Sequence, residues 1–203
     1  MNFPQFRYFS IFLLLVVILL GGSSCTSSRP SHGKKNVYEG ESICSVALLP
    51  FINGSRFEQG NLIMQRVFAA ELTRIAGIEV ASEGDVQNIY RELRIYPNQL
   101  PSIEQIRVLG SRLDVQLVIS GRITEMEEKM GDNYVNPVLA VTLQVYDAKR
   151  GKTMWNTYHR REGTDYRKVM HFGLVNTVTQ LSRIISDEII EEWFAEGMKQ
   201  CGK

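Results

Sequence analysis

Two apolar stretches separated by a short turn decide the fold of this chain: Val138-Leu139-Ala140-Val141-Thr142-Leu143-Gln144-Val145-Tyr146 and Thr153-Met154-Trp155-Asn156-Thr157-Tyr158. β-branched and aromatic residues are frequent in both, as in the strands of a half-buried sheet. The intervening residues 147–151, Asp-Ala-Lys-Arg-Gly, have the composition of a tight turn. Together the two stretches predict an antiparallel β-hairpin.

Outward from this hairpin, short apolar runs predict three further strands, at residues 44–51, 78–81 and 115–123. Apolar residues at helical spacing predict helices between these strands, at residues 61–76, 82–93 and 102–113. Capping boxes that begin at Ser82 and Ser102 support the last two helices. The order of elements predicts the class α/β (α+β sandwich), with a mixed five-stranded sheet and helices on its faces.

A long C-terminal helix closes the predicted fold. Apolar residues recur on one face from Leu174 to Ile189, and the pattern predicts a helix over residues 165–195, or roughly 45 Å. This is a core helix or, alternatively, one that also packs against neighbouring subunits. Trp193 near its end, and Trp155 in the hairpin, are candidate membrane or subunit contacts, with core packing as the alternative for each.

The N-terminus has the order of a secretory signal peptide. Arg7 is the only charged side chain among the first 28 residues, an apolar run follows at residues 8–20, and small residues occupy 21–24. An uncleaved anchor is the alternative, although a spanning helix needs about 20 apolar residues. We therefore predict a signal peptide over residues 1–24.

The end of this segment, Ser23-Ser24-Cys25, resembles the lipobox of bacterial lipoproteins, with Gly22 where that family usually has Leu. The resemblance implies cleavage before Cys25, diacylation of its sulfur and acylation of the new amine. Two or three acyl chains anchor a protein stably in a membrane. Because Thr26 stands where an Asp would resemble an inner-membrane retention signal, the predicted location is the periplasmic face of the outer membrane.

The mature chain divides into a tether and a folded part. Residues 25–42 contain much Ser, Pro, Gly, Lys and Glu and few apolar residues, which is typical of a lipidated, flexible tether. Fully extended, about 17 residues span roughly 55 Å. Residues 43–203 form the predicted single periplasmic α/β domain.

Two cysteines remain, Cys44 and Cys201, at opposite ends of this domain. An exported protein is in an oxidising compartment, where a disulfide between them would join the C-terminus to the first strand. Two unrelated thiols are the alternative, because a disulfide also requires that the two Cα atoms lie close together.

Composition argues against several functions. The chain has 203 residues with Lys+Arg 23 and Asp+Glu 22, a formal net charge of +1, whereas nucleic-acid binders usually show a basic excess. The three histidines are scattered, and no metal-binding or nucleophile motif is present. The three glutamates within residues 125–128 could serve acid–base chemistry, but a solvated face is the preferred interpretation. We expect no enzyme activity, no catalytic residue, no metal, no cofactor and no nucleic-acid partner.

Three segments resemble motifs of the curli-secretion-type (CsgG-like) lipoprotein family: Val46–Phe51 with Asn53 and Ser55, Leu109-Gly110 followed by Asp114-Val115 and Ser120–Glu125, and Val145–Asp147 with Gly151 and Trp155. The resemblance covers about residues 44–195. It implies a domain type that is shared by the ring-forming lipoprotein of Pel exopolysaccharide export, a lipoprotein activator of peptidoglycan synthases and the N-terminal domain of the Tol-system periplasmic protein.

Two connections distinguish this chain from the curli channel, whose subunits carry long membrane-spanning hairpins. Met126–Asn136 and Arg160–Thr164 are short and polar, whereas a spanning hairpin needs about 20 residues or more. We expect no transmembrane hairpin, and a character closest to the ring-forming Pel export lipoprotein.

These observations predict a non-enzymatic outer-membrane lipoprotein, attached to the membrane by its N-terminal lipid. The leading hypothesis is a homo-oligomeric, ring-like component that assists export or assembly of a surface polymer. The alternative is a monomeric tethered adaptor that regulates a cell-wall (peptidoglycan) synthase or another envelope complex. The partners are therefore envelope export proteins or cell-wall proteins.

Overall fold

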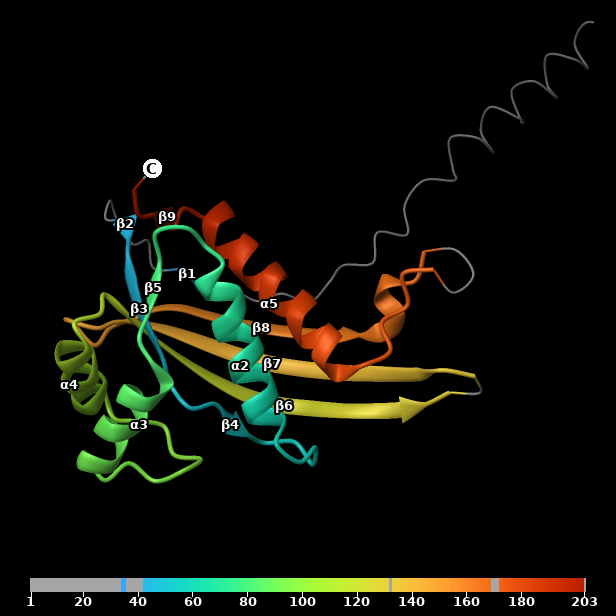
Figure 1. Cartoon of the computed structure of the whole chain (residues 1–203), viewed down its shortest axis with the longest axis horizontal. Helices are drawn as coiled ribbons and strands as arrows, with labels where there is room; N and C mark the ends of the chain where they lie inside the picture. Colours follow the sequence, from blue (N-terminus) through green and yellow to red (C-terminus); the bar gives the residue numbers. More distant parts are fainter. Residues whose placement is uncertain (1–33, 36–41, 132, 169–171, 203) are drawn as a thin grey trace, which may run out of the picture.

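The computed structural model describes residues 34–35, 42–131, 133–168 and 172–202. It has a mixed sheet with helices on both faces (Figure 1), which confirms the predicted fold class. The strands are β1 Lys34–Lys35, β2 Ser42–Ile43, β3 Ser45–Leu48, β4 Ile52–Asn53, β5 Glu79–Val80, β6 Leu117–Met130, β7 Val135–Asp147, β8 Thr153–Glu162 and β9 Lys199–Gln200. The helices are α2 Gly60–Thr73, α3 Glu83–Glu92, α4 Ile103–Leu113 and α5 Val178–Ala195, with a short 3-10 turn at Gly163–Tyr166.

All five predicted strands lie in one sheet, in the order β1-β8-β7-β6-β3-β5, and β4 also pairs with β6. The β3 strand runs parallel to both β5 and β6, as the β-α-β order of the first half requires. The β6, β7 and β8 strands are antiparallel. The two-residue strands β1 and β4 extend the expected five-stranded arrangement.

The sheet separates two hydrophobic cores. Successive side chains of β3 and of Leu49, the residue after it, point alternately into one core and the other. Val46 and Leu48 pack into the larger core, which α2 and α5 cover. Ala47 and Leu49 pack into a smaller core with residues of α3 and α4. Successive side chains of a strand point to opposite faces, so an uninterrupted apolar run such as Val46–Leu49 indicates a strand buried on both sides.

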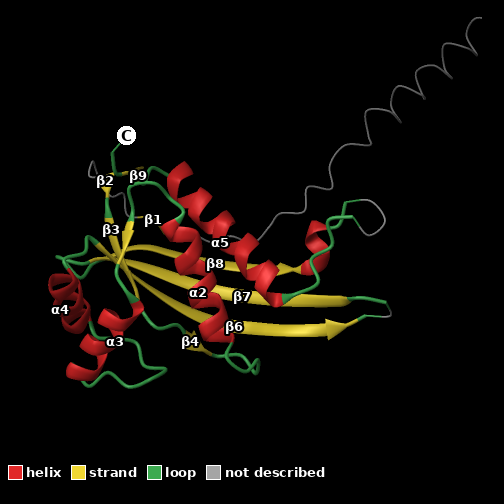
Figure 2. Cartoon of the chain, in the orientation of Figure 1, coloured by secondary structure: helices red, strands yellow, loops and turns green. Residues whose placement is uncertain are grey.

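The β6–β7 hairpin is much longer than the sequence suggested. Residues 126–136 were expected to form a polar connection, but they complete strands of 14 and 13 residues that extend beyond α2 and α5 (Figure 2). Charged residues are compatible with these strands because they alternate on the solvent-facing side. There, Glu125 accepts a hydrogen bond from Arg160 Nε at 2.8 Å, and Lys129 Nζ lies 2.8 Å from Glu127.

The C-terminal helix begins at Val178, so the prediction of a helix from Asp165 was wrong. Gly173 has a φ of +79°, outside the helical region. Thr177 is the N-cap, and its side chain accepts a hydrogen bond from the Gln180 amide at 3.2 Å. At 18 residues the helix is about 27 Å long. No helix among the described residues has the length and apolar composition needed to cross a membrane.

The chain joins the sheet earlier than expected. Lys34 and Lys35, within the predicted tether of residues 25–42, pair with Asn156 and Trp155 of β8. Ser42 and Ile43 pair in parallel with Lys199 and Gln200 of β9, in a separate two-stranded sheet. Lys34, Lys35 and Ser42 are therefore not part of a free tether, and the stretch between Cys25 and the first strand, residues 26–33, is only eight residues long.

Candidate functional site

The residues singled out in the sequence do not meet in one place. Cys25, the predicted lipid attachment site, and the signal peptide of residues 1–24 lie outside the described residues. Cys44 and Cys201 meet at one end of the sheet, and Trp155 and Trp193 lie in the larger core. Among the described residues, the structure thus separates the cysteine pair from the two tryptophans.

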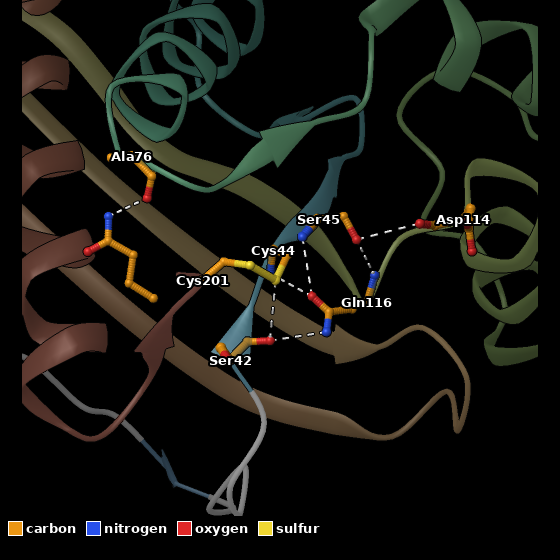
Figure 3. Close-up of a disulfide and its surroundings, with 8 residues drawn as sticks. Ser42, Cys44, Ser45, Ala76, Asp114, Gln116 and Cys201 are labelled. Carbon is orange, nitrogen blue, oxygen red and sulfur yellow. Dashed lines mark hydrogen bonds between the residues drawn. A yellow bond between two sulfur atoms is a disulfide. The ribbon is translucent and has the colours of Figure 1, made fainter. Parts of the chain in front are cut away.

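A disulfide joins Cys44, directly before the first residue of β3, to Cys201 (Figure 3). The two Cα atoms are 4.9 Å apart, although 157 positions separate the residues in sequence. Pairing of β2 with β9 places them together, because each cysteine follows directly after one of these strands. The bridge joins the segment after α5 to the first core strand.

The side chain of Gln116 supports this junction, and the sequence analysis had not singled it out. Its Oε1 accepts hydrogen bonds from the Cys44 amide at 2.6 Å and the Ser45 amide at 3.2 Å, and its Nε2 donates to the Ser42 carbonyl at 3.1 Å (Figure 3). One amide side chain thereby satisfies three backbone groups of the chain entering β3. No sequence signal could have found it, because its partners lie more than 70 positions away.

Both tryptophans are buried, so their interpretation as membrane or subunit contacts does not fit their positions. Trp193 is 2% exposed and Trp155 is 6% exposed. The Trp193 ring lies edge-on against Phe68 of α2, with 5.7 Å between centroids and 75° between planes. Both are core residues, because period-2 alternation in β8 and the helical period in α5 direct them inward.

A row of polar side chains is buried beside Trp155. Thr157, His159 and Arg161 alternate along β8 on the face toward α5. The Arg161 guanidinium is paired with Glu188, at 2.8 Å. His159 is 2% exposed, and neither ring nitrogen has a hydrogen-bond partner among the described residues, although Glu192 Oε2 lies 3.0 Å from Nε2. Burial, assisted by the charge of Arg161, lowers the pKa of His159 from 6.5 to about 4.

This depressed pKa predicts that acid destabilises the fold through His159. Between pH 6.5 and about pH 4, His159 is mostly protonated in the unfolded chain and mostly neutral in the folded protein. The free energy of unfolding should therefore fall by about 2 kcal/mol from this group between pH 7 and pH 5. The check is denaturant unfolding of wild type and His159→Gln at both values.

The comparison with His159→Gln is needed because other groups also make stability depend on pH. The pKa values of Glu192 and Asp187 are raised, mainly by burial, so their protonation at lower pH increases the free energy of unfolding. The difference between wild type and variant isolates the histidine. Equal pH dependence of the two proteins would contradict the neutral, buried state of His159.

The described residues contain no group of three or more His, Cys, Asp or Glu side chains placed to hold a metal ion. A pocket of about 700 Å³ lies beside α4, and charges of both signs line it, including Glu104, Arg107, Asp114 and Lys149. The glutamates at 125–128 have structural roles. Glu125 pairs with Arg160, Glu127 pairs with Lys129, and Glu128 accepts a hydrogen bond from the Val178 amide at the start of α5.

Comparisons with solved structures define the fold. The PelC dodecamer from Paraburkholderia phytofirmans matches with a TM-score of 0.56 and 13% identity, covering 84% of this chain and 98% of that chain. Lipoprotein GNA1162 from Neisseria meningitidis matches with a TM-score of 0.52 and 15% identity, covering 75% of this chain and 99% of that chain. No protein-family model and no curated protein sequence matches.

The class that these matches define is an α/β domain with a PelC-like fold, a fold also found in lipoprotein GNA1162. At such low identity the likeness shows the fold alone. The finer resemblance to curli-secretion-type lipoproteins stays a prediction, since the matches support the PelC-like fold and not that family.

Proposed function

We propose that this chain is a non-enzymatic lipoprotein of the outer membrane's periplasmic face. In this proposal, a signal peptide of residues 1–24 is removed, acyl chains on Cys25 hold the mature protein, and residues 43–203 are the working domain. The domain self-associates as a ring and assists export or assembly of a surface polymer. The PelC-like fold supports this proposal, since the matched protein is a dodecamer, but the fold is also compatible with an adaptor.

The position of β1 favours the ring at the membrane surface over the adaptor. Because Lys34 and Lys35 already belong to the sheet, only eight residues separate it from Cys25, and the chain from Cys25 to Lys34 spans at most about 30 Å. An adaptor that reaches a cell-wall synthase needs a long free tether. A collar at the membrane surface needs a domain held close to the lipid, as here.

The test is the mass of the full lipidated protein, extracted in mild detergent and measured by analytical ultracentrifugation with particle imaging. We expect a closed particle of many copies, and acyl chains on Cys25 by mass spectrometry. The matched control is Cys25→Ser, which should lose the acyl chains and leave the membrane fraction.

A strictly monomeric wild type contradicts self-association. If an affinity pulldown from that monomer also returns a peptidoglycan synthase, the adaptor function replaces the ring. Acyl chains on wild type, independent of its mass, test the anchoring separately.

A further inference from the structure

Two exposed apolar side chains lie at the far end of the β6–β7 hairpin. Met130, the last residue of β6, is 82% exposed, and Phe172, in the loop before α5, is 78% exposed. The two loops meet there, because the Arg167 guanidinium carbon lies 5.1 Å from the centroid of the Tyr134 ring. We call this surface the hairpin end: Met130, Tyr134, Arg167, Lys168 and Phe172.

Backbone hydrogen bonds join described residues on either side of each loop. The Gly131 amide donates to the Tyr134 carbonyl at 2.8 Å. The Lys168 amide donates to the Phe172 carbonyl at 2.9 Å. Phe172 itself, and Gly131 next to Met130, are therefore held by backbone hydrogen bonds.

We propose that the hairpin end docks on the lipid surface in which Cys25 is anchored, with Met130 and Phe172 entering the headgroup region. This inference rests on the anchoring proposed above. Apolar side chains flanked by an aromatic ring and cations suit a membrane interface. Arg167 and Lys168 are exposed cations that attract anionic headgroups.

Carboxylates also lie near the hairpin end, and cations pair with only some of them. Glu125 and Glu162 share Arg160, at 2.8 and 3.0 Å, and Glu127 pairs with Lys129. The exposed carboxylates Glu128 and Asp165 accept hydrogen bonds from backbone amides and have no ion pair among the described residues. The docking therefore rests on the apolar side chains, with Arg167 and Lys168 as the cations beside them.

The direction of β1 supports the same orientation. β1 is antiparallel to β8, so its N-terminal end, at Lys34, points toward Glu162. In the strand register, Lys34 lies opposite Asn156 of β8, and Glu162 of β8 lies opposite Val138 of β7. The distance along the strands from Asn156 through Glu162 to the hairpin end is about 30 Å. The chain from Cys25 to Lys34, with eight residues between them, spans at most the same distance, about 30 Å. The anchor can therefore reach the plane of the hairpin end.

The experiment uses the full lipidated protein in vesicles of phosphatidylethanolamine and phosphatidylglycerol, with brominated acyl chains as the fluorescence quencher. Met130→Trp and Phe172→Trp each place an indole at the hairpin end. Tyr96→Trp is the matched control, because Tyr96 is an aromatic residue, 71% exposed, in the loop after α3. Asn98 of that loop bonds to Asn53 of β4, which pairs with Ile123 of β6, away from the hairpin end. Wild type supplies the background of the buried Trp155 and Trp193.

We expect brominated lipid to reduce the added emission of both hairpin-end variants and to leave that of Tyr96→Trp unchanged. Acylated, vesicle-bound protein without quenching at either hairpin-end position overturns the docking and leaves the anchoring intact. Absence of acyl chains refutes the anchoring, and the inference with it. A blue shift of the two variants that appears only as the number of protein copies per vesicle rises, without lipid quenching, indicates that a second copy covers this surface and overturns the inference.

Discussion

Replacing Cys44 and Cys201 together by serine is expected to lower the free energy of unfolding by about 5 kcal/mol. The disulfide closes a loop of 157 positions, nearly the whole domain. In the chain-entropy model, a cross-link over so long a loop removes many conformations from the unfolded chain. A loss of this size is a large part of the stability of a typical domain.

The measurement is urea unfolding of wild type and the double variant, each with and without reductant. Reductant should destabilise wild type to the level of the double variant and leave the variant unchanged. Replacing only Cys44 is a matched control, since it breaks the same bridge and keeps Cys201 as a free thiol. If wild type unfolds identically with and without reductant, the two cysteines are not bonded in solution.

Trp193→Ala is expected to cost about 3–5 kcal/mol of unfolding free energy, because it removes the largest buried side chain near the α2–α5 contact. The cavity would lie beside Phe68, whose ring packs against Trp193. Trp193→Phe should cost much less, since an aromatic ring remains. The indole Nε1 has no hydrogen-bond partner among the described residues, so no hydrogen bond is lost.

Denaturant unfolding and sedimentation of the same variants separate a core role from a contact role. Phe194→Ala is the control, because Phe194 is the adjacent aromatic residue of α5 and is only partly buried. A Trp193→Ala protein with unchanged stability but weakened self-association would contradict the core position and restore the subunit-contact interpretation.

The anchoring geometry links the two proposals. If the hairpin end faces the lipid, α3 and α4 face away from it, since they lie at the other end of the sheet (Figure 1). In that orientation the surface beside α4, with its pocket of mixed charge, lies on the side away from the lipid.

Local patterns in the sequence predicted which elements exist, because each depends on neighbours in the chain. The β-branched and apolar residues of 138–146, and the capping box at Ser102, which the structure has in full, are local features of the chain. The ends of elements were less predictable. Leu174 continues the apolar pattern of α5, but the helix starts at Val178, where Thr177 and the distant Glu128 bond the first amides.

The sequence alone thus determined the α/β class and most of its strands and helices, and the resemblance of Ser23-Ser24-Cys25 to a lipobox remains a prediction of a membrane anchor. The tertiary structure decided what depends on residues far apart in the chain. It brought Cys44 to Cys201, buried both tryptophans, and extended the β6–β7 hairpin so that Met130 meets the loop of Phe172. Such contacts follow from sheet register and packing, which no local periodicity encodes.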